Sequence, residues 1–112
     1  MYAIVGMLKR PPEWSRAQFR SWWLEEHAEI AKKLPGLRRY TVHPPTDAFD
    51  AVSGKLEGEP SQDGLAFLWF DDKEAAEAAF ASPQGEHDRV TFGRTGVSVI
   101  IFGTAESREM LG

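Results

Sequence analysis

The stretch that decides the fold is residues 15–40, SRAQFRSWWLEEHAEIAKKLPGLRRY, which predicts a helix, a tight turn and then a strand. Ser15, with Gln18 three residues later, has the spacing of a capping box, in which two side chains close the start of a helix. Large apolar side chains then recur at helical spacing as far as Leu34. Pro35-Gly36 ends the helix, so the chain is expected to turn there and enter a strand.

The segments on either side contain short apolar runs bounded by turn residues, which are typical of strands and helix ends. Strands are expected at residues 2–8, 37–43, 65–70 and 97–102, a helix at 72–81 with Asp71 as its cap, and a short helix from Ser82-Pro83. This order, β-α-β-loop-β-α-(α)-β, predicts an α+β fold. Specifically, it predicts a ferredoxin-like βαββαβ domain with an antiparallel four-stranded sheet, spanning residues 1–112 as a single domain.

The strands also predict a homodimer. Strands 2–8, 65–70 and 97–102 carry large apolar side chains on both faces, whereas two helices can cover only one face of a four-stranded sheet. The other face needs a partner, and a second copy of the same sheet is the simplest one. Residues 44–63, rich in Pro, Gly, Asp, Glu and Ser, are expected to form a long surface loop. Because such loops often cover a site, we expect a mobile cover over a pocket or over the dimer edge.

The composition excludes several classes of protein. The 13 basic and 17 acidic residues give a net charge of −4, so the chain lacks the basic surface that nucleic-acid binding requires. It has no cysteine, which excludes disulfides and thiolate chemistry. The apolar run at residues 2–8 is too short to span a membrane, and it lacks the preceding charged segment with which a signal sequence begins. We therefore expect a cytoplasmic protein that binds neither membrane nor nucleic acid.

His27 is the main candidate for chemistry because it lies on the apolar stripe of the first helix. It is either a buried histidine satisfied by hydrogen bonds or a general acid or base in a pocket between the helix and the sheet. Burial in such a pocket would lower its pKa and leave a neutral imidazole at pH 7. Tyr40 follows the turn, so it either opens on the same pocket or is simply a core aromatic residue.

Three more side chains are candidates for substrate binding. Trp23 and Trp69 could line an aromatic ligand site, although tryptophans at helical spacing are more often part of the core. Arg38 could pair with a carboxylate on a substrate or remain a surface residue. The run GEHDR at residues 85–89 has the character of a solvated face.

These residues resemble the signature of the EthD-domain family, a helix of the form F-x-x-x-W-x-x-x-H followed by P-G-L-x-x-Y. Here the two halves of the signature are residues 19–27 and 35–40, and residues 63–72, 81–85 and 99–106 resemble the rest of the family pattern. The resemblance implies a dimeric α+β barrel, in which two sheets close on each other and each subunit keeps a pocket between its sheet and helices. It also implies chemistry without a metal or an organic cofactor.

One branch of the family, similar to methylmuconolactone methylisomerase, places a histidine of the first helix and a tyrosine after P-G-L at the pocket. The resemblance therefore implies that His27 and Tyr40 are catalytic residues. That branch also has a cysteine immediately before the strand tryptophan, where this chain has Leu68.

These residues and the resemblance leave three functions open, each of a different class. The first is a cofactor-free lyase or isomerase that performs acid–base chemistry on a small oxygenated, aromatic or lactone-like molecule, with His27 moving the proton and Tyr40 holding an oxygen. The second is a non-catalytic small-molecule-binding protein, or an accessory to an oxidative degradation pathway. A third is haem binding with His27 as the axial ligand.

Overall fold

The computed structural model describes residues 1–112 and confirms the predicted α+β, ferredoxin-like fold. One antiparallel sheet has the strand order β2-β5-β1-β6. Its strands are β1 (Tyr2–Lys9), β2 (Arg39–His43), β5 (Gly64–Phe70) and β6 (Ser98–Thr104). The central strand β1 pairs with β5 on one side and with β6 on the other, so β2 and β6 form the two edges of the sheet.

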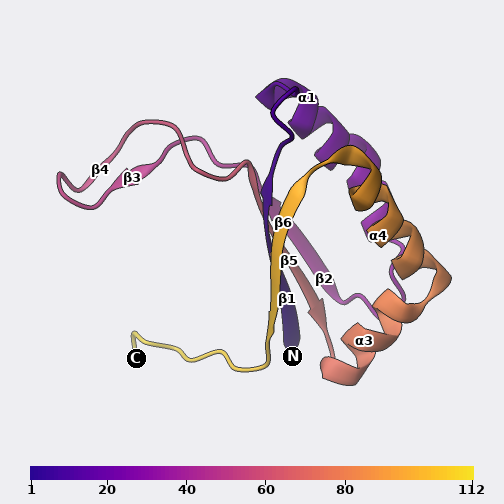
Figure 1. The fold of residues 1–112 in the computed structure, drawn as a ribbon. Helices are drawn as coiled ribbons and strands as arrows, with labels where there is room; N and C mark the ends of the chain where they lie inside the picture. The colour runs from indigo at the N-terminus through magenta and orange to yellow at the C-terminus, as the bar shows by residue number, and fades with distance from the viewer.

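The helices all cover the same face of this sheet (Figure 1). The first is continuous and has three parts: α1 (Arg16–Ser21), the π-helical segment η1 (Trp22–His27) and α2 (Ala28–Ala31). The other two helices are α3 (Lys73–Ala81) and α4 (Pro83–Thr95). No helix combines the length and the apolar character needed to cross a membrane. We call the face of the sheet opposite the helices the outer face.

The helix ends follow local side-chain chemistry. The predicted capping box is present, because the Ser15 side chain accepts from the Gln18 backbone N–H while the Gln18 side chain accepts from the Ser15 N–H. The prediction of Asp71 as the cap of α3 is wrong by one residue: Asp72 caps that helix, and Asp71 forms an ion pair with Arg38. The helix predicted to be short after Ser82 runs for 13 residues.

The core lies between the helices and one face of the sheet. Phe19, Trp22 and Trp23 of the first helix pack on Leu8 and Ala66, and a second cluster lies between α3 and the neighbouring ends of the strands. The outer face carries a different set of apolar side chains, because neighbours along a strand point to opposite sides. By the strand register these are Val5, Met7, Leu65, Phe67, Trp69, Ile100 and Phe102.

We call residues 44–63 the arm. The arm does not lie over the helix-side face of the sheet, so the expectation that it covers a pocket there is wrong. It contains a short hairpin of β3 (Phe49–Asp50) and β4 (Lys55–Leu56) and projects from the sheet on the outer-face side (Figure 1). Its exposed apolar residues are Phe49, Val52 and Leu56. The C-terminal tail, residues 105–112, has no regular structure and extends to the same side.

The base of the arm is held by a cluster of charged side chains. The Asp63 carboxylate, only 8% exposed, accepts a hydrogen bond from the Arg10 backbone N–H at 2.9 Å. Its other oxygen lies 3.5 Å from both the Arg10 and the Arg16 guanidinium groups. Charged and backbone contacts therefore join the end of β1, the start of α1 and the return of the arm into β5.

Candidate functional site

A cavity of about 50 Å³ lies between the helices and the sheet. Its lining is mostly apolar, and the only ionisable side chains in it are His27, Tyr40 and Asp88. Its volume is enough for one or two water molecules. Ile101, on the edge strand β6, lines the cavity and is 60% exposed, so the cavity opens at this edge. A larger ligand must displace the side chains at this opening.

The π-helical segment η1 sets the position of His27. The Ala28 N–H bonds to the Trp23 carbonyl five residues back, which inserts one extra residue into the turn. Residues five apart are not neighbours on an α-helix, but this wider turn stacks the His27 ring on Trp22, with ring centroids 5.2 Å apart. Phe92 of α4 meets the imidazole edge-on at 4.2 Å. The side chain is thus held between two aromatic rings and is 4% exposed.

Asp88 is the site residue that sequence reasoning missed. The expectation that residues 85–89 form a solvated face is wrong at Gly85 and Asp88, which are both buried, and Asp88 Oδ2 lies 3.4 Å from His27 Nε2. A signal was present: Gly85, Asp88 and Phe92 are spaced three and four apart and form the inner stripe of α4. Tertiary packing turns this stripe toward the first helix.

Burial, rather than pairing of charges, governs the protonation of these two groups. Desolvation lowers the pKa of His27 to about 4 and raises the pKa of Asp88 to about 6, an effect that nearby Arg89 partly opposes. At pH 7 the site therefore holds a neutral imidazole beside a carboxylate. The Nδ1 atom of His27 is buried without a hydrogen-bond partner, which leaves one ring nitrogen available to a bound molecule.

Tyr40 reaches the same cavity from β2, as the turn after the first helix predicts. Burial, together with the negative charge of Asp88, raises the pKa of Tyr40 to about 12. Its phenol therefore stays protonated at any physiological pH and can donate a hydrogen bond to an oxygen.

The three predicted substrate-binding residues separate. Trp23 lines the cavity, and its ring lies so close to Gly64 that a Cβ there would come within 2.7 Å of it. Trp69 does not line the cavity, because it alternates with Leu68 and faces the outer side, where Arg39 stacks on it at 4.7 Å. Arg38 is also outside, exposed and held by two hydrogen bonds to Asp71.

No group of three or more His, Cys, Asp or Glu side chains is arranged to hold a metal ion. The chemistry that the site can perform with its own residues is proton transfer and hydrogen bonding. A carboxylate, a neutral imidazole and a neutral phenol meet in one small cavity whose lining is otherwise apolar.

Comparison with known proteins adds the family and the fold. The family model of the EthD domain matches residues 11–92. An uncharacterized 11.0 kDa protein in the thcB–thcC intergenic region of Rhodococcus erythropolis is 27% identical over 103 residues, covering 89% of this chain and 91% of that protein.

Two solved structures share the fold over nearly the whole chain. An EthD family protein from Bacillus halodurans C-125 has a TM-score of 0.70 and 21% identity, covering 96% of this chain and 100% of that one. SnoaB, a cofactor-independent oxygenase from Streptomyces nogalater, has a TM-score of 0.65 and 14% identity, covering 99% and 97%.

Proposed function

Since this chain belongs to the EthD-domain family, we propose that it is a cofactor-free enzyme of the lyase or isomerase type. It would move a proton on a small oxygenated molecule, aromatic or lactone-like. The observation that carries this proposal is the meeting of His27, Asp88 and Tyr40 in one otherwise apolar cavity. Side chains whose pKa values are shifted by burial and that line one cavity are characteristic of acid–base sites.

The roles follow from the protonation states. The His27–Asp88 pair holds one proton between about pH 4 and pH 6 and none above about pH 6, so at pH 7 it is ready to accept one. It would take a proton from a carbon next to a carbonyl, while the Tyr40 hydroxyl donates a hydrogen bond to the oxygen that gains negative charge. The pair would return the proton to another carbon, which is an isomerisation, or to a departing oxygen, which is an elimination. No oxidant is consumed.

SnoaB supports this reading at the level of fold alone. That protein is described as a cofactor-independent oxygenase, so a related fold acts there without a cofactor. The alternative for the present chain is binding without turnover, in which the same cavity holds a ligand and passes it on. This alternative uses the same residues and differs only in whether a bound molecule exchanges protons.

Deuterium uptake at carbon tests the proposal before a substrate is known. A panel of neutral lactones, cyclic ketones and hydroxyaromatic compounds is incubated with the protein in D₂O and followed by NMR. We expect exchange with at least one compound, at a rate that rises through about pH 6 as the His27–Asp88 pair loses its proton. Replacing His27→Gln should slow exchange by roughly 10²–10⁴-fold, and Tyr40→Phe by roughly 10²–10³-fold.

The matched control is His87→Gln, because His87 is an exposed histidine of α4 that lines neither the cavity nor the outer face of the sheet. Its exchange rate should equal that of the wild type. Exchange that is equally fast in all the variants would refute the roles of His27 and Tyr40. Binding of panel compounds without exchange would establish the ligand-binding alternative instead.

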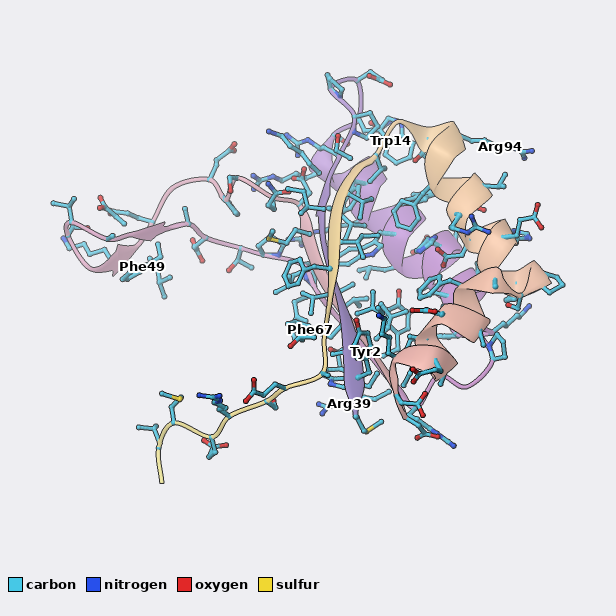
Figure 2. All side chains as sticks on the ribbon, turned by 60° about the horizontal axis from the view of Figure 1, so that its bottom comes forward. Tyr2, Trp14, Arg39, Phe49, Phe67 and Arg94 are labelled. Atoms are coloured by element: carbon cyan, nitrogen blue, oxygen red, sulfur yellow. The ribbon has the colours of Figure 1, made fainter.

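We also propose that the protein acts as a homodimer joined through the outer faces of two sheets. Ile100 and Phe102 are about half exposed on this face. The arm and the tail project on the same side, and Figure 2 shows Phe67 and Phe49 both lying on the side away from the helices. A second copy seated there would cover these apolar groups and bury an interface well above ~1,000 Å².

Sedimentation equilibrium at micromolar concentration checks the dimer. Ile100→Asp should weaken association by at least about 100-fold, because it buries an unpaired carboxylate in the proposed interface. Val90→Asp is the matched control: Val90 is 43% exposed, close to the 56% of Ile100, but lies on α4. A wild-type protein that sediments as a stable monomer would contradict the proposal.

A further inference from the structure

We propose that the cavity prefers uncharged substrates to carboxylates, and that the buried Asp88 side chain makes this selection. This inference rests on the proposed function and deepens it by naming the charge of the molecule that the site accepts.

The cavity is lined by one carboxylic acid and by no permanently cationic side chain. The Asp88 side chain is 9% exposed, and no lysine or arginine lines the cavity. The groups that face Asp88 from the packed elements are His27 of η1, which is neutral at pH 7, and Tyr40 of β2. Arg89 follows Asp88 on α4, but it is exposed and is not part of the lining.

Three other arginines are held outside the cavity by ion pairs. Arg38 is exposed and bound to Asp71, and Arg10 and Arg16 surround Asp63 at the base of the arm. An anionic group that entered the cavity would therefore meet the Asp88 carboxylate with no cation in the lining to compensate its charge.

The size of this effect decides specificity. Two like charges about 5 Å apart, at an effective dielectric constant of ~20, repel strongly enough to weaken binding on the order of 100-fold. An uncharged oxygen avoids this repulsion and can accept a hydrogen bond from the Tyr40 hydroxyl. The unpartnered Nδ1 atom of His27 can accept a hydrogen bond from a hydroxyl or amide group of the same molecule.

A matched set of ring compounds tests the selection. Benzamide, benzyl alcohol and benzoate are titrated at pH 7.5 and followed by intrinsic tryptophan fluorescence, since Trp23 lines the cavity and Trp22 stacks on His27. We expect the two uncharged compounds to bind, and benzoate to bind on the order of 100-fold more weakly. In Asp88→Asn, benzoate should come within about 10-fold of benzamide. Asp71→Asn is the control, because it removes an exposed carboxylate distant from the cavity and should leave the wild-type ratio unchanged.

A second measurement needs no variant. At pH 5 benzoate is still ionised but Asp88 is protonated, so wild-type discrimination against benzoate should fall as it does in Asp88→Asn. Benzoate binding as tightly as benzamide at pH 7.5 would overturn the inference and leave the proposed function standing. A wild-type ratio that stays the same at pH 5 would also overturn it. If neither these compounds nor the lactones and ketones of the exchange panel bind, the cavity is not a ligand site and the proposed function falls as well.

Discussion

Replacing Gly85→Ala should destabilise the protein by about 3 kcal/mol or more and lower its melting temperature by roughly 10–20 °C. Ser82 ends α3 and also caps α4, so the chain passes from one helix into the next within one residue and the two helices meet closely. A Cβ at residue 85 would collide with the Ala79 carbonyl oxygen and would lie 2.5 Å from the Phe80 Cα. These are backbone atoms, which cannot rotate away, so one helix must shift and disturb the packing of Asp88.

Gly93→Ala is the matched control on the same helix. Nothing lies within 4 Å of a Cβ built there, and alanine is favoured over glycine in a helix by up to about 1 kcal/mol. Thermal melts at one fixed protein concentration should therefore show Gly93→Ala at or above the wild type and Gly85→Ala far below it. Equal melting temperatures for the two variants would show that α3 and α4 are not as close as the structure places them.

Removing Asp88 should make stability strongly dependent on pH. In Asp88→Asn the buried His27 remains, with its pKa lowered to about 4 from 6.5. As pH falls from about 6.5 to about 4, the unfolded chain binds a proton at His27 and the folded chain does not. Stability should therefore fall, relative to the wild type, by up to about 3 kcal/mol over this range.

The reciprocal variant has the opposite sign. In His27→Gln only Asp88 remains, and its pKa is raised to about 6 from 3.8. As pH falls from about 6 to about 4, the folded state takes up a proton that the unfolded state does not. Stability should therefore rise relative to the wild type, by up to about 3 kcal/mol.

In the wild type these two effects offset each other, because the folded and unfolded pair each hold one proton between about pH 4 and pH 6. Urea unfolding at a series of pH values measures all three proteins, and the difference from the wild type removes the contribution of the other carboxylates. Curves for Asp88→Asn and His27→Gln that run parallel to the wild type would refute the burial of this pair.

The sequence by itself determined the order of elements, and with it the fold. The Ser15–Gln18 capping box, the helical stripe that contains Trp23 and His27, and the stop at Pro35-Gly36 are local signals that act over a few residues. Their physical basis is hydrogen bonding at helix ends and backbone sterics, which need no knowledge of distant contacts. The alternation along β2 likewise placed Tyr40 on the helix side.

Alternation also held the information that corrects Trp69. Tyr40 pairs with Leu68, so Trp69, one residue on, must face the outer side with Arg39. The pattern of the strand was sufficient for this conclusion once the register was known. Register between strands is a property of the assembled sheet, so the site assignment of Trp69 could not be made from its own strand alone.

Only the tertiary structure decided the composition of the site. Asp88 lies 61 positions after His27 in the sequence, and its neighbours Glu86, His87 and Arg89 are exposed. It becomes a site residue because α4 turns its inner stripe toward the first helix, and because the π-helical segment η1 rotates His27 onto Trp22. Both depend on packing free energy gained between segments distant in the chain. The local preferences of residues for helix or strand do not predict this packing. The same packing buries His27 and Asp88, and burial shifts their pKa values in opposite directions.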